Sequence, residues 1–177
     1  EDFKSTYKNN FAKTFLIITF FCSVAAFWNK EVIMLLMKKD YFDSIYIIPF
    51  VVLGIWSYSN ADLLKSSIFV PAKKLKYMVF VFFLMPVLVY FAFYFINFYI
   101  SNLLISLAVA FGVGSFISFF IACLLVYREF KLVLISYSNA LFFLLSTLYV
   151  GSFYILSPLW VRSLLSLLYI GVALYLM

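Results

Sequence analysis

The residues best suited to chemistry are one acid and one base inside an apolar region. Asp62 and Lys65 lie in the polar run SNADLLKSS, which follows the apolar run YIIPFVVLGIW. On one helix, side chains at positions i and i+3 are neighbours, so these two can pair. Below a lipid surface such a pair indicates a functional site, because ionisable residues are expensive there.

A helix through this run would gather its polar side chains on one stripe, about 120° wide at about 100° per residue. Asn60 and Ser67 would point away from the stripe. Such a stripe is typical of a helix that lines a hydrated cavity. The alternative is that the helix ends near Trp56 and that the polar run is a solvated loop. The stripe consists of Tyr58, Ser59, Asp62, Lys65 and Ser66.

A basic cluster follows Pro71, and we name it the basic clamp; it consists of Lys73, Lys74 and Lys76. We expect the clamp to mark the cytoplasmic interface. At about 1.5 Å per residue, Lys65 would lie about 12 Å deeper than Lys73, and Asp62 about 16 Å deeper. Both depths fall inside a hydrocarbon core about 30 Å thick.

Composition indicates that lipid is the solvent around these residues. The 177 residues are 67% apolar and only 11% charged, whereas soluble domains are about 25% charged. We expect an all-α integral membrane bundle of about six transmembrane helices in one domain, 1–177. The first span is either one long tilted helix or a shorter span with an interfacial segment. The expected spans are 14–37, 44–70, 77–98, 102–127, 132–155 and 159–177.

The basic residues predict the orientation. The N-terminal tail, the 65–76 region and the 128–131 connection share one side and hold nine of the 13 Lys and Arg residues. We expect that side, with both ends of the chain, to be cytoplasmic. Arg162, near the opposite end of the last span, is expected to anchor it. The small residues of Phe111-Gly-Val-Gly-Ser115 predict close helix packing.

The same composition argues against several other classes of protein. The cations are scattered along the chain, which does not favour nucleic-acid binding. The chain has no histidine and two isolated cysteines, so we expect neither an enzyme nor a metal or cofactor site. Because the sequence begins with Glu1, we expect it to be a fragment of a longer protein.

Three segments carry a family resemblance. They are Leu35-Leu-Met-Lys-Lys-Asp-Tyr41, Ile48-Pro-Phe-Val-Val-Leu-Gly54 and Ala72-Lys-Lys-Leu-Lys76. Their order resembles the C-terminal half of bacterial polysaccharide and O-antigen flippases, in the multidrug/oligosaccharidyl-lipid/polysaccharide exporter superfamily. The segment ending IACLLVYREF resembles the next paired span of that family. The family's usual IPxxGxxGAAxA pattern is absent, and Asn102-Leu-Leu-Ile-Ser106 and Gly112-Val-Gly114 stand in its place.

The resemblance implies one half of a twelve-helix transporter that works by alternating access. Its substrate would be an undecaprenyl-pyrophosphate-linked oligosaccharide, flipped across the bacterial cytoplasmic (inner) membrane for cell-surface polysaccharide biosynthesis. Its partners would be membrane lipid and the N-terminal half of the transporter. Lys65 and the basic clamp would attract the diphosphate, while Asp62 orients Lys65 or couples to a cation gradient. The alternatives are a multidrug-type exporter with one essential carboxylate, an integral membrane transferase, and a purely structural bundle subunit.

Overall fold

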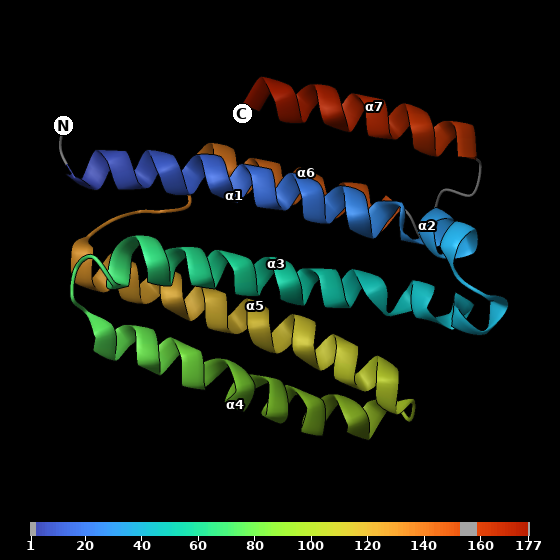
Figure 1. Ribbon diagram of the computed structural model, residues 1–177, viewed down its shortest axis with the longest axis horizontal. Helices are drawn as coiled ribbons and strands as arrows, with labels where there is room; N and C mark the ends of the chain where they lie inside the picture. The colour runs from blue at the N-terminus through green and yellow to red at the C-terminus, as the bar shows by residue number, and fades with distance from the viewer. Residues whose placement is uncertain (1–2, 153–158, 177) are drawn as a thin grey trace.

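The protein is described by a computed structural model, which covers residues 3–152 and 159–176. Every regular element in these ranges is helical, as the sequence predicts. Figure 1 shows the long helices lying side by side, roughly along one direction. The elements are α1 (Phe3–Phe27), α2 (Asn29–Leu36), the 3-10 helix η1 (Lys39–Tyr46), α3 (Ile48–Leu64), the π-helix η2 (Lys65–Phe69), α4 (Leu75–Tyr99), α5 (Leu103–Phe130), α6 (Tyr137–Ser152) and α7 (Leu159–Leu176).

Four helices within the described ranges are long and apolar enough to cross a membrane. The expected six-span bundle is therefore supported for four spans. Within the expected span 132–155 the helix begins only at Tyr137, and residues 153–155 lie outside the described ranges. In α7 the described apolar part, Val161–Tyr175, is shorter than a full span. The four candidate spans are Tyr7–Phe27, Ser44–Phe69, Leu75–Tyr99 and Leu103–Phe130.

The first expected span is divided in two. Helix α1 ends at Phe27, and Trp28 has φ −92° and ψ 10°, outside the helical region. The short helix α2 follows at once, so the alternative of one long tilted helix is wrong. Helix α2 exposes Leu35 and Leu36, as an interfacial segment would.

Helix α5 is the centre of a three-helix layer, with α3 and α4 both packed along it. Two glycines make this close approach possible, as the small residues of the sequence predict. A Cβ atom at Gly112 would lie 2.8 Å from the carbonyl oxygen of Phe50, and one at Gly114 would lie 2.7 Å from the backbone of Val89. Side chains at these two positions would hold the helices apart, so glycine sets the spacing.

Helix α1 joins this layer to the remaining helices, because it packs on both α3 and α6. The contact is aromatic and centres on Trp56 of α3. The indole ring lies edge-on to Phe15 at a centroid distance of 5.5 Å and stacks on Phe143 of α6 at 4.8 Å. The indole N–H donates a 2.8 Å hydrogen bond to the hydroxyl of Thr19, so the buried polar end of Trp56 is satisfied.

Candidate functional site

The polar run SNADLLKSS is helical along its whole length. Helix α3 continues through Trp56 to Leu64 and passes directly into η2, which ends at Phe69. The continuous helix through the run is therefore confirmed, and the alternative of a loop beginning near Trp56 is wrong. In the π turn the N–H of Val70 donates to the carbonyl of Lys65 at 3.1 Å. Turns of this kind are rare and often occur at functional sites.

Asp62 and Lys65 form the ion pair that their spacing predicts. The Lys65 Nζ lies 3.0 Å from the Asp62 Oδ1, with the two side chains 39% and 50% exposed, respectively. Ser66 does not join the pair, because its hydroxyl donates to the backbone carbonyls of Asp62 and Leu63. Because both side chains of the pair are partly exposed, another charged group can reach them.

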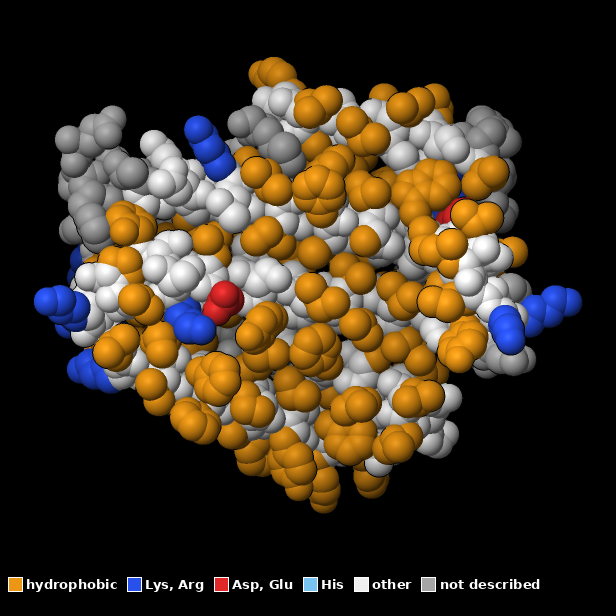
Figure 2. Space-filling model, in the orientation of Figure 1, with side chains coloured by type: hydrophobic (Ala, Val, Ile, Leu, Met, Phe, Trp, Pro, Cys, Tyr) orange, Lys and Arg blue, Asp and Glu red, His pale blue; other side chains and the backbone are white. Residues whose placement is uncertain are grey.

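The ion pair borders an apolar groove of about 450 Å³ between α3 and α4, with α5 beneath it. Of the predicted stripe, Tyr58, Asp62 and Lys65 line the groove, whereas Ser59 and Ser66 are not part of its lining. Figure 2 shows that this face of the molecule is covered mainly by hydrophobic side chains. The other lining residues are Ala61, Phe69, Met78, Val81, Phe82, Met85, Pro86, Val89, Phe111 and Ser118.

The basic clamp lies at the turn between η2 and α4, but its lysines have different surroundings. Lys74 Nζ lies 3.4 Å from the Glu129 Oε2 at the end of α5, and the Tyr77 hydroxyl donates to the other oxygen of Glu129. Lys76 lies over the ring of Tyr77, 4.9 Å from its centroid. Lys73 is exposed and has the left-handed backbone of a tight turn, with φ 55°. Lys74 is thus held by α5, while Lys73 and Lys76 stay exposed.

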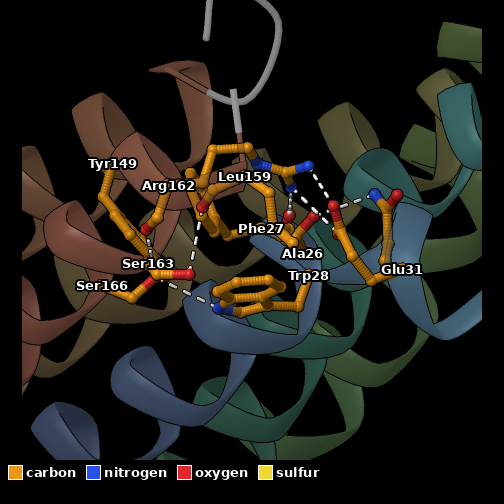
Figure 3. Close-up of polar contacts among 10 residues, drawn as sticks. Ala26, Phe27, Trp28, Glu31, Tyr149, Leu159, Arg162, Ser163 and Ser166 are labelled. Carbon is orange, nitrogen blue, oxygen red and sulfur yellow. Dashed lines mark hydrogen bonds and ion pairs between the residues drawn. The ribbon is translucent and has the colours of Figure 1, made fainter. Parts of the chain in front are cut away.

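A third ion pair joins α7 to α2, and the sequence analysis did not find it (Figure 3). Arg162 is only 3% exposed, so it does not anchor the helix in an interface as expected. Its guanidinium binds the carboxylate of Glu31, with Nη2 3.1 Å from Oε2, and Nη2 also donates to the Phe27 carbonyl at 2.7 Å. An arginine inside an apolar run needs a partner, and that signal could have led to Glu31.

Hydroxyl groups extend this contact between α1, α6 and α7 (Figure 3). The Ser166 hydroxyl donates to the carbonyl of Arg162 at 2.9 Å and accepts a 3.1 Å hydrogen bond from the indole N–H of Trp28. The Tyr149 hydroxyl lies 2.8 Å from the same oxygen, and the Tyr149 ring stacks on Tyr169 at a centroid distance of 4.2 Å. This region is closed by its own contacts, which favours a structural role.

The charged groups of the two regions are single ion pairs. Within residues 3–152 and 159–176, no group of three or more His, Cys, Asp or Glu residues is placed to hold a metal ion. The arrangement at the groove can do something else: it can hold an apolar chain against α3, α4 and α5 while a charged group meets Lys65 or Asp62. This combination suits an amphiphile.

No family model, curated protein or solved structure matches the chain.

Proposed function

We propose that this chain is one helical bundle of a membrane transporter that flips a lipid-linked oligosaccharide during cell-surface polysaccharide biosynthesis. The observation that carries the proposal is the Asp62–Lys65 ion pair on an unbroken helix beside an apolar groove of about 450 Å³. A polyprenyl chain fits the apolar lining, and a diphosphate fits an ammonium group. The proposed substrate is an oligosaccharide on undecaprenyl pyrophosphate.

Lys65 is the proposed contact for the diphosphate. A lysine ammonium is a compact cation with three donors, and charge-assisted hydrogen bonds to phosphate are about twice as strong as neutral ones. Asp62 holds this ammonium on the groove side of α3 when no substrate is bound. Because the pair is only partly buried, substrate can replace the carboxylate at a modest cost.

The proposed setting is the bacterial cytoplasmic membrane, with the basic clamp on the cytoplasmic side. The positive-inside rule supports this orientation. The groove lies on an exposed, mainly hydrophobic face (Figure 2), which in this proposal meets lipid and the N-terminal half of the transporter.

The test is translocation of the lipid-linked sugar in cells that depend on the full-length protein. Lys65→Ala is expected to abolish surface polysaccharide, while Lys65→Arg keeps a part of it because the charge remains. Lys13→Ala removes an exposed cation from α1 and serves as the matched control. Unchanged surface polysaccharide in Lys65→Ala at normal protein level would contradict the proposal.

A multidrug-type exporter is the second candidate, and one observation favours it. Asp62 is a half-exposed carboxylate at the border of an apolar groove, which is the chemistry that a hydrophobic cation needs. In that case Asp62→Asn would abolish transport and Lys65→Ala would leave it intact. The relative tolerance of the two positions therefore separates the two functions.

A further inference from the structure

Two fully buried amide groups each have one polar atom without a hydrogen-bond partner among the described residues. They are Oδ1 of Asn60, whose residue is 0% exposed, and Nδ2 of Asn139, whose residue is 1% exposed. The other end of the Asn60 amide is satisfied, because its Nδ2 donates to the Trp56 carbonyl at 2.8 Å. The unpaired atom of Asn60 is thus an acceptor, and that of Asn139 is a donor.

The register of α3 and α6 brings these two amides to the same level. The two helices run in opposite directions (Figure 1), and Trp56 stacks on Phe143 between them at 4.8 Å. Asn60 follows Trp56 by about one turn, and Asn139 precedes Phe143 by about one turn. In antiparallel helices these two steps go the same way, so the two amides fall at about the same level of the contact between α3 and α6.

We propose that one ordered water molecule bridges Asn139 and Asn60. It accepts a hydrogen bond from Asn139 Nδ2–H and donates one to Asn60 Oδ1. The Asn139 Nδ2 group is an unpaired donor and the Asn60 Oδ1 atom is an unpaired acceptor. A group that bridges them must both accept and donate a hydrogen bond, and water is the smallest such group. Leaving both amide atoms unpaired would cost about 1–3 kcal/mol each. Buried waters commonly fill such polar gaps.

A bound cation fits this site less well. The amide N–H of Asn139 would point its positive end at the ion, and neither side chain carries a negative charge to offset the loss of hydration. A direct Asn60–Asn139 hydrogen bond is absent from the described contacts, since both atoms lack partners.

The bridge would give α6 a polar link to the α3–α4–α5 layer. Helix α6 packs mainly on α1, and it also reaches α3 through the stacking of Phe143 on Trp56. A water held by two amides fixes one level of α6 against α3, because a shift by one turn would remove both hydrogen bonds. This inference is independent of the proposed function of the groove.

The first test is a thermal unfolding cycle on the full chain in detergent micelles. Asn60→Leu and Asn139→Leu, which keep the volume roughly constant, are each expected to lower Tm by several degrees. The double variant is expected to lose clearly less than the sum, since it leaves no unpaired amide atom behind. Asn10→Leu, on an exposed position of α1, is the control and should leave Tm unchanged. Additive losses would overturn the proposal.

The second test identifies the bridging species. A high-resolution crystal structure of the full chain is expected to show one density peak at about 2.7–3.2 Å from both amide atoms. The peak and the Tm should be the same in sodium chloride and in choline chloride. A direct amide–amide hydrogen bond, or a Tm that rises with sodium, would overturn the water assignment.

Discussion

Arg162 and Glu31 form an ion pair across 131 positions of the chain, and the pair joins helix α7 to the break between α1 and α2. The guanidinium also donates to the Phe27 carbonyl, which lies at the end of α1, and packs 4.8 Å from the ring centroid of Phe27. One buried side chain therefore satisfies a carboxylate and a helix end together. Removal of either partner would leave the other charged group without its counter-charge.

We expect Glu31→Gln to destabilise the protein by about 2–4 kcal/mol, because Arg162 would stay buried without its counter-charge. Thermal unfolding in detergent micelles measures the effect. Lys30→Gln changes an exposed neighbour on the same helix and should leave Tm unchanged. Combining Glu31→Gln with Arg162→Met should recover stability relative to Glu31→Gln alone. Equal Tm values for Glu31→Gln and the unchanged protein would show that the ion pair does not stabilise the packing of α7 against α2.

The two glycines of α5 should be intolerant of a methyl group. Gly112→Ala and Gly114→Ala would each place a Cβ under 3 Å from the backbone of α3 or α4, and we expect a loss of about 1–3 kcal/mol. Gly151 and Gly171 are matched controls, because a Cβ there would meet nothing within 4 Å. Alanine at either control position should raise Tm slightly, since it favours the helix. Similar effects at all four positions would contradict close packing.

Lys131 ends α5 with a left-handed backbone, φ 54°. We expect Lys131→Gly to raise Tm by about 2–4 °C, because glycine adopts this conformation without strain. Lys13→Gly, in the middle of α1, should lower Tm, since glycine weakens a helix interior. Thermal unfolding of both variants tests whether the two changes in Tm have opposite signs. A loss at both positions would indicate that Lys131 has a different backbone conformation.

The variant Asp62→Asn should show which residue of the ion pair, Asp62 or Lys65, is needed for transport. In a lipid flippase the amide can still hold Lys65, so we expect a smaller loss of surface polysaccharide than in Lys65→Ala. Complementation of cells that lack the full-length protein, at matched protein levels, gives the ratio. A larger loss in Asp62→Asn than in Lys65→Ala would favour the exporter.

The sequence predicts the local features of this fold well. Asp62 and Lys65 are three residues apart, so the helical period alone brings them together. The signal for glycine packing is equally local, because a small residue on an apolar helix has few other uses. For the ion pair the partner lies within one turn, whereas for the glycines only the small side chain is local and the facing backbones of Phe50 and Val89 are distant in sequence.

Other features depend on contacts that no local pattern carries. Glu31 and Arg162 meet only after α1, α6 and α7 have packed. They lie on different helices, so no helical repeat in the sequence relates one position to the other. The break at Trp28 depends on the same packing, because Trp28 donates to Ser166 of α7. The groove likewise needs Met78 and Met85 of α4 beside α3, which apolar composition does not specify.

The π turn from Lys65 to Phe69 also makes the chain tolerant of a change in length. A π turn contains one residue more than the α-helical turn it replaces, so deleting Ser67 would leave an ordinary α-helix rather than a gap. Because the extra residue is absorbed within this one turn, the clamp would keep nearly the same angle around the helix axis relative to Asp62. The turn between α3 and α4 thus stores one surplus residue that the chain can lose without a change of direction.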